Sequence, residues 1–134
     1  MGGLARLKLL LDTHIWLWMV GNPRQLRPST LGQLKDPNNE LWLSPISTWE
    51  ALTLHHKGRM FLGPDLRIWL AEAASGTHEA PFTHEIVLAA MKLPLHPDPA
   101  DRFLAATAQV LDLTLVTADE RLLGLGNIRS LANR

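Results

Sequence analysis

The sequence contains no cysteine, which excludes disulfide bonds, thiolate zinc sites and cysteine nucleophiles together. It also lacks an excess of positive charge, because 13 lysines and arginines are balanced by 13 aspartates and glutamates. The chain therefore has no general affinity for nucleic acids or anionic lipids, and any polyanion site must be local. No run of ~18 apolar residues occurs, so we expect no membrane-spanning helix and no membrane partner. The absence of cysteine fits a reducing cytoplasm, which is the localisation we expect.

Enough hydrophobic sequence is present to build a packed core. Of the 134 residues, 46% are hydrophobic and 19% are charged, which argues against intrinsic disorder. The chain shows no repeats, linkers or low-complexity tracts. We therefore expect residues 1–134 to form one domain.

Short apolar runs alternate with helical patterns along the chain. The apolar runs predict strands at residues 7–11, 41–43, 80–82 and 113–117, with a last strand near Ile128. Helices are predicted between them, at residues 15–19, 28–34, 47–57, 64–75, 84–91, 98–111 and 120–123. Strands that alternate with helices are joined by crossovers. We therefore expect an α/β fold, a three-layer α/β/α sandwich with a central, mostly parallel sheet.

Four acidic residues follow strands or begin helices at one edge of this sheet. Asp12 comes directly after the first strand, and Asp119 lies two residues after the fourth. Glu50 is expected in the first turn of the helix after the second strand, and Asp101 in the first turn of the long helix after the third. Because the carboxyl ends of parallel strands meet at one edge, the four carboxylates are expected to converge on one pocket.

Helix capping is an alternative explanation for each of these acids. Ser-Thr-Trp-Glu at residues 47–50 has the spacing of a capping box. Asp98, followed by proline, could cap the long helix with Asp101 in its first turn, and Asp12 and Asp119 could be caps themselves. Capping does not exclude metal binding, because a helix N-terminus also favours negative charge. Helix capping does not explain why an Asp-Thr-His tripeptide follows a buried strand.

Clustered carboxylates repel one another unless a cation neutralises them. Their oxygens suit Mg²⁺ or Mn²⁺ better than Zn²⁺. One or two such ions would activate a water for in-line attack on a phosphodiester and stabilise the charge on the leaving oxygen. The acids therefore indicate metal-dependent phosphodiester hydrolysis, which needs neither cysteine nor histidine.

Four motifs occur in a fixed order along the chain. They are Leu-Leu-Asp-Thr-His at residues 10–14 followed by Trp18, then residues 44–50 ending in Ser-Thr-Trp-Glu, then His-Pro-Asp-Pro-Ala-Asp-Arg at residues 96–102, and Leu-Val-Thr-Ala-Asp at residues 115–119. A Lys-Gly-Arg turn at residues 57–59 follows the second. In this order the motifs resemble PIN-domain ribonucleases of the VapC toxin type. The resemblance covers nearly the whole chain, and the ordered set is specific although each motif alone is weak.

This resemblance implies a PIN-like α/β/α fold and an endoribonuclease dependent on Mg²⁺ or Mn²⁺, with one or two ions per site. It also implies an RNA substrate, a homodimer, and a cognate antitoxin as partner in a type II toxin–antitoxin pair. One departure is Ala100, where many relatives have an aromatic residue. By motif position the catalytic and metal-binding residues would be Asp12, Glu50, Asp101 and Asp119, with Asp98 as a further candidate ligand and Thr117 as a supporting polar neighbour.

Two roles are possible for the basic and aromatic residues near these motifs. Lys57, Arg59 and Arg102 could contact phosphates beside the scissile bond, or could be solvated surface, and Arg102 could instead pair with an acid. The tryptophans in apolar elements are expected in the core or in a dimer interface rather than stacked on bases; they are Trp16, Trp42, Trp49 and Trp69.

Two other functions remain open. An Asp-dependent phosphatase would also place an aspartate after the first strand, but a haloacid-dehalogenase-like site would have a second aspartate two residues on, where this chain has His14. A non-catalytic binding module would keep the acids as caps and use its apolar helices as an interface. Indifference to metal ions would distinguish that module from a nuclease.

Overall fold

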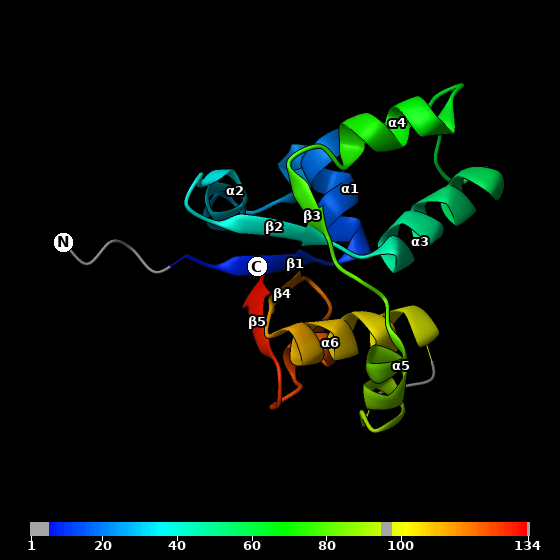
Figure 1. Ribbon diagram of the computed structural model, residues 1–134. Coiled ribbons are helices and arrows are strands. Elements are labelled where there is room, and N and C mark those ends of the chain that lie inside the picture. Colours follow the sequence, from blue (N-terminus) through cyan, green and yellow to red (C-terminus); the bar gives the residue numbers. More distant parts are fainter. Residues whose placement is uncertain (1–5, 95–97, 134) are drawn as a thin grey trace.

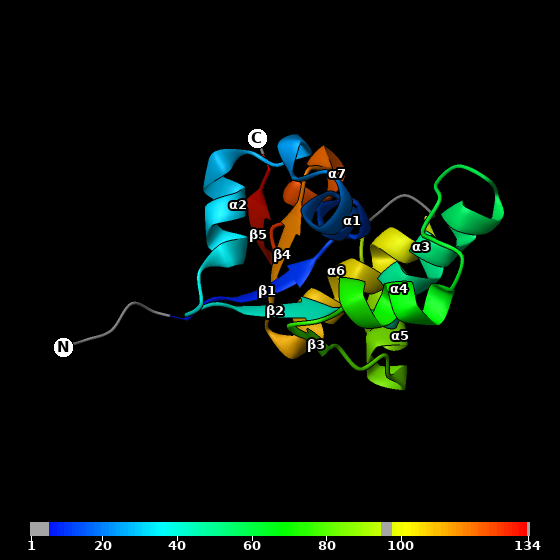
Figure 2. The same cartoon turned by 90° about the horizontal axis from the view of Figure 1, so that it is seen from above.

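The computed structural model describes residues 6–94 and 98–133, and its middle layer is a sheet in which all five described strands pair in parallel. The order across the sheet is β3-β2-β1-β4-β5, so β1 lies at the centre (Figures 1 and 2). The strands are β1 (Lys8–Leu11), β2 (Glu40–Leu43), β3 (Thr77–Glu79), β4 (Thr114–Thr117) and β5 (Arg129–Ala132).

Helices cover both faces of this sheet. The core on one face is formed with α1 (Thr13–Gly21), α2 (Pro28–Lys35), α3 (Pro45–His56) and α4 (Leu66–Ala73). The core on the other face is formed with α5 (His84–Met91), α6 (Pro99–Leu111) and α7 (Glu120–Leu123). Figure 1 labels α5 and α6, and Figure 2 labels α7. A short 3-10 helix, Pro23–Gln25, connects α1 to α2. The predicted three-layer α/β/α sandwich is confirmed. No helix in the described ranges is long and apolar enough to cross a membrane.

Side chains of the central strands alternate between the two cores. Leu10 packs with Leu115 on the side of α5, α6 and α7. Leu9, Leu11 and Val116 pack on the side of α1 to α4. All five are fully buried, because helices cover both faces of the sheet. This double burial explains why β1 and β4 are nearly uninterrupted apolar runs in the sequence.

The third strand lies earlier than the sequence predicted. It was expected at residues 80–82, whereas β3 ends at Glu79, at the edge of the sheet. An edge strand of three residues buries little surface, so its polar sequence carries no apolar signal. The predicted segment comes directly after it, and the N–H of Ala80 still donates to the carbonyl oxygen of Leu43 at 2.9 Å.

Helix α3 begins before the predicted start at Ser47. Its first residue is Pro45, and Ser44 is the N-cap, with its Oγ accepting the N–H of Ile46 at 3.0 Å. Proline suits the first helical position, so the Ser-Pro pair determines where this helix begins. Glu50 consequently lies in the second turn rather than the first, and the capping-box interpretation is wrong.

The tryptophans divide between core and surface. Trp16 is fully buried and its indole N–H donates to the carbonyl oxygen of Ala73 at 2.8 Å. Trp69 packs against it, with ring centroids 5.2 Å apart. Trp49, however, is 65% exposed, because α3 turns Ala51 toward the core instead. The expectation of packing in the core is therefore wrong for Trp49 within this chain.

Candidate active site

Asp12 lies at the junction of β1 and α1, where three hydrogen bonds hold it. Its N–H donates to the carbonyl oxygen of Val116 at 3.0 Å, which extends the ladder between β1 and β4 by one residue. Its Oδ1 accepts the N–H of Thr13 at 2.8 Å, and its Oδ2 accepts the hydroxyl of Thr117 at 2.6 Å. The carboxylate is thereby fixed at the carboxyl edge of the sheet.

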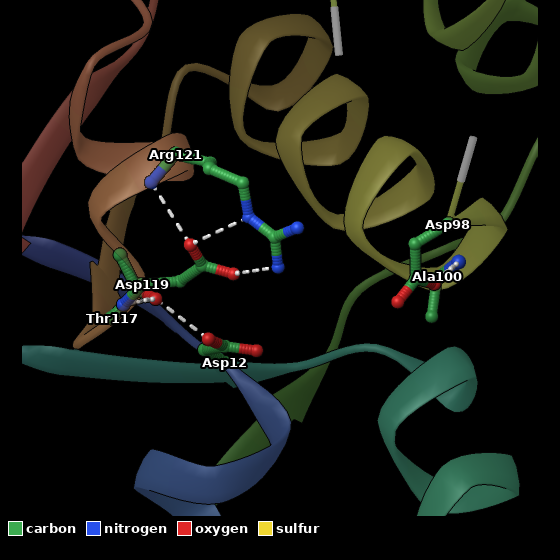
Figure 3. A network of polar contacts seen from close by, with 6 residues as sticks. All are labelled: Asp12, Asp98, Ala100, Thr117, Asp119 and Arg121. Carbon is green, nitrogen blue, oxygen red and sulfur yellow. Dashed lines mark hydrogen bonds and ion pairs between the residues drawn. The ribbon is translucent and has the colours of Figure 1, made fainter. Parts of the chain in front are cut away.

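Thr117 joins two of the predicted acids. It is the last residue of β4 and is fully buried. Its Oγ1 donates to Asp12 and accepts the backbone N–H of Asp119 at 3.0 Å (Figure 3). A hydroxyl can donate one hydrogen bond while accepting others, so one side chain positions both residues. Thr117, the predicted supporting neighbour, thus fixes the positions of Asp12 and Asp119 relative to each other.

Asp119 is the N-cap of α7 and carries an ion pair. Its Oδ1 accepts the backbone N–H of Arg121 at 2.9 Å. The guanidinium of the same arginine donates from Nε to Oδ1 at 3.3 Å and from Nη2 to Oδ2 at 3.2 Å. Figure 3 shows this guanidinium beside the Asp119 carboxylate, on the side that faces α6. A fixed positive charge therefore lies within the acidic site.

Glu50 is held by a hydroxyl group of α1. Its Oε1 accepts the hydroxyl of Thr13, the first residue of α1. Thr13 Oγ1 is also 2.9 Å from Ser47 Oγ on α3, and both residues are buried. Since a carboxylate only accepts and Thr13 has one hydroxyl proton, Thr13 donates to Glu50 and accepts from Ser47. The sequence interpretation assigned neither hydroxyl this role.

Two further acids come from the start of α6. Asp98 is its N-cap, and the carboxylate Oδ1 accepts the N–H of Ala100 at 3.0 Å. Asp101 lies in the first turn, as predicted. Ala100 itself is buried. His96 and Pro97, which open the third sequence motif, lie outside the described residues.

One pocket, with a volume of about 400 Å³, is lined by all five of these acids. They come from four separate stretches of the chain and meet beyond the carboxyl ends of β1 and β4. The predicted convergence is therefore observed, although Glu50 reaches the pocket from the second turn of its helix. The lining residues are Asp12, His14, Ile15, Trp18, Glu50, Asp98, Asp101, Ala118, Asp119 and Arg121.

Burial makes two of the carboxyl groups harder to ionise. It raises the pKa of Asp12 above its usual value, although the hydrogen bonds from Thr117 and Thr13 act in the opposite direction. Burial likewise raises the pKa of Glu50, opposed by the Thr13 hydroxyl and reinforced by the negative charges of Asp12 and Asp98. Burial, with a smaller contribution from the neighbouring acids, therefore disfavours the charged form of both groups, and a bound cation would favour it.

Some acids of the pocket cap helices and also belong to the cluster. Asp12, Asp98 and Asp119 are N-caps that accept backbone N–H groups, so the capping interpretation is confirmed for these three. Asp101 lies in the first turn of α6, where the capping interpretation placed it and where a helix N-terminus favours negative charge. Glu50 lies in the second turn of α3, so capping alone leaves this acid unexplained.

The three basic residues proposed for RNA contact lie elsewhere. Lys57 is the C-cap of α3, Arg59 follows it, and both are exposed and absent from the pocket lining. Arg102 donates from Nη1 to the carbonyl oxygens of Ala90 at 2.9 Å and Leu93 at 3.1 Å. It thus ties the end of α5 to α6, a structural role with carbonyl partners.

The donor chemistry of the pocket suits a hard divalent cation. Within residues 6–94 and 98–133, no three acidic or histidine side chains are grouped closely enough to hold one ion. Mg²⁺, however, keeps several waters and is often bound through one or two carboxylates, so it does not require such a group. Five carboxylates around one open pocket, two of them resisting ionisation, fit an ion of this kind.

Comparison with known proteins places the chain in a family. The sequence pattern of the PIN domain matches residues 9–127. The chain belongs to the PIN-domain family. This PIN domain is 32% identical over 116 residues to a protein named Ribonuclease VapC22 from Mycobacterium tuberculosis, an alignment that covers 85% of this chain and 88% of that protein. Ribonucleases of this PIN-domain type are generally dependent on divalent metal ions.

Solved structures share the fold of this PIN domain. A crystal structure of VapBC2 from Rickettsia felis, bound to a DNA fragment from the promoter, matches with a TM-score of 0.70 and 17% identity. DNA-bound VapBC from Salmonella typhimurium matches with a TM-score of 0.66 and 19% identity. Each alignment covers 94% of this chain and 98% of the other. At such identities these likenesses establish the fold.

Proposed function

We propose that this PIN domain is a divalent-metal-dependent endoribonuclease and the toxin of a type II toxin–antitoxin pair. The observation that carries the proposal is the convergence of five carboxylates on one pocket at the carboxyl edge of the sheet. The identity to a named ribonuclease supports RNA as the substrate. The structural relatives are VapBC assemblies, which supports an antitoxin partner and a homodimer. Because the substrate would be cellular RNA, we place the activity in the cytoplasm.

The proposed metal-binding residues are Asp12, Glu50, Asp101 and Asp119, with Asp98 as a further ligand. A divalent cation bound there would supply an activated water for attack on the phosphodiester and neutralise charge on the leaving oxygen. We propose Mg²⁺ as the physiological ion, with Mn²⁺ as a substitute, because every acidic donor is a hard carboxylate oxygen.

The neighbouring hydroxyl groups preorganise these ligands. The hydroxyl of Thr117 holds Asp12 Oδ2, and that of Thr13 holds Glu50 Oε1. Each carboxylate is thereby restrained before any ion or substrate arrives. Such restraint reduces the reorganisation that binding would otherwise require.

The test is cleavage of a panel of structured RNAs, including transfer RNAs, in Mg²⁺, in Mn²⁺ and in EDTA. Asp12→Asn and Asp101→Asn should each lower the cleavage rate by ~100-fold or more, as for loss of a group that stabilises the transition state. Calorimetric titration with Mn²⁺ should show weaker binding by both variants. Cleavage that survives EDTA, or that Asp12→Asn retains, would contradict the assignment.

Asp65→Asn is the matched control for the capping alternative. Asp65 caps α4, accepting the N–H groups of Arg67 and Ile68, and lies outside the acidic pocket. Asparagine caps about as well as aspartate, so this variant should fold normally and retain cleavage and metal binding. If instead all three aspartate variants behave alike, the acids of the pocket are caps without catalytic roles.

A further inference from the structure

Arg121 is the one lysine or arginine among the described residues that line the acidic pocket. RNA phosphates that approach five carboxylates meet repulsion, and a chain with no net charge does nothing to offset it. A cation bound by the acids would attract one phosphate, but a charged protein group at the same place would also bind and orient it. Arg121 has the position and the charge for this task.

The geometry of Arg121 suits a phosphate ligand. Its guanidinium forms a fork on Asp119, with contacts at 3.3 Å and 3.2 Å. The side chain is nevertheless 61% exposed, whereas that of Asp119 is 25% exposed. Asp119 therefore anchors the arginine from within, while the arginine still faces solvent. The planar fork that pairs with a carboxylate fits the oxygens of a phosphate equally well.

Neighbouring acids keep the guanidinium over the pocket. Besides Asp119, the charges of Asp101 and Asp98 on α6 attract it, and they contribute to raising its pKa. Figure 3 shows the Arg121 guanidinium between Asp119 and the start of α6 where Asp98 lies. A divalent cation bound to Asp119 would weaken the ion pair, because both positive charges compete for one carboxylate. Metal binding would thereby make the arginine available to the substrate.

We propose that Arg121 binds a phosphate of the RNA at the active site and is held over the pocket by Asp119 until the substrate arrives. This inference rests on the proposed endoribonuclease function, because it assigns a residue to the binding of that substrate. It moves the phosphate contact from Lys57, Arg59 and Arg102, which lie outside the pocket, to a residue that lines it.

The experiment measures kcat and KM for a cleaved RNA of the panel over a range of KCl concentrations. Arg121→Gln should raise KM about tenfold with a smaller change in kcat, because one charged hydrogen-bonded contact is lost. The slope of log(kcat/KM) against log[KCl] should become shallower by about 0.7, the contribution of one phosphate contact on a single strand. Arg121→Lys should keep the slope and lose part of the affinity, because lysine carries the charge without the fork.

Arg129→Gln is the matched control. Arg129 is 64% exposed and also pairs with an aspartate, Asp112, but at the start of β5, the opposite end of the sheet. This variant removes the same charge and should reproduce the KM and the salt slope of the parent. Thermal melts of all variants check folding, which an exposed arginine should hardly affect.

Calorimetric titration with Mn²⁺, without RNA, provides a second readout. Arg121→Gln should bind Mn²⁺ at least as tightly as the parent, because the positive charge of Arg121 no longer competes with the ion for Asp119. Weaker Mn²⁺ binding, or a KM and salt slope equal to those of the parent, would overturn the inference while leaving the nuclease intact. If the parent cleaves no RNA of the panel, the proposed function fails and this inference fails with it.

Discussion

Replacing Thr117 by valine removes the buried hydroxyl that joins Asp12 to Asp119 beside the acidic pocket, while leaving side-chain volume almost unchanged. The hydroxyl donates to Asp12 at 2.6 Å and accepts the N–H of Asp119 at 3.0 Å, and Thr117 is fully buried. A hydrogen bond to a charged group contributes about 1.5–3 kcal/mol, and one to a backbone N–H contributes about 1 kcal/mol. The buried methyl group that replaces the hydroxyl returns about 1 kcal/mol.

The expected net loss in the free energy of unfolding is about 2 kcal/mol in the absence of metal. At the average unfolding entropy of ~2.1 cal/mol/K per residue, that loss lowers Tm by about 7 °C for a chain of this length. Thr117→Ser is the control, because it keeps both hydrogen bonds and loses only a methyl group, at a cost of about 1 kcal/mol. Valine should therefore be the more destabilising substitution, although it is the more hydrophobic.

The pH dependence gives this prediction a second signature. The Thr117 hydroxyl lowers the pKa of Asp12, so its removal raises that pKa further above the usual value of 3.8. A carboxyl with a raised pKa in the folded state binds more protons there than in the unfolded state, and stability then falls as pH rises. The gap in Tm between the valine and serine variants should accordingly widen from acid toward neutral pH. Scanning calorimetry in EDTA measures it, and a valine variant that melts at or above the serine variant at neutral pH would refute the reasoning.

Other outcomes follow from the same contacts. The rise in Tm on adding Mg²⁺ should grow from acid toward neutral pH, because Asp12 and Glu50 have raised pKa values and must lose protons to bind the ion. A rise in Tm that is independent of pH would contradict this. Trp16→Phe should cost about 2 kcal/mol in urea unfolding, through loss of a buried hydrogen bond, whereas Trp49→Ser should change stability by less than about 0.5 kcal/mol. Arg102→Gln should lower Tm without altering the salt dependence of RNA cleavage, since Arg102 donates to carbonyl oxygens within the fold. An unchanged Tm with a shallower salt dependence would restore Arg102 as a phosphate contact.

The strands that carry the site could be predicted closely from the sequence. β1 and β4 are covered on both faces over most of their length, so apolar and β-branched residues dominate them and each lies within the predicted range. Asp12 directly follows β1 and Asp119 lies two residues after β4, and their place at the carboxyl edge follows from parallel pairing. β3 was misplaced because an exposed edge strand needs no hydrophobic residues.

Helix boundaries were harder to predict where two signals compete. Ser44 and Ser47 are both residue types that cap helices, and the proline between them decides in favour of the first. The error moved Glu50 by one turn, yet the residue still faces Thr13, because α3 runs close to the start of α1. Its place in the pocket thus depends on how two helices pack, which no local pattern reveals.

Arg121 was missed for a different reason. An arginine two residues after an aspartate looks like an ordinary surface pair in the sequence, and that pair does exist. Its place over five carboxylates depends on contacts between segments far apart in the chain. A basic residue within two positions of a strand-end acid could have been singled out, because such positions lie at the edge of the sheet where ligands bind.

The hydrogen bond between Thr117 and Asp12 spans 105 positions of the chain and has a consequence for synthesis on the ribosome. β1 is translated well before its partner β4 and the acid that follows that strand. A nascent chain, or a product of premature termination before residue 114, lacks one wall of the pocket. Such non-local pairing also forms late in folding. The acidic pocket is therefore complete only after β4 and Asp119 have been translated, so shorter nascent chains carry Asp12 and Glu50 without the complete site.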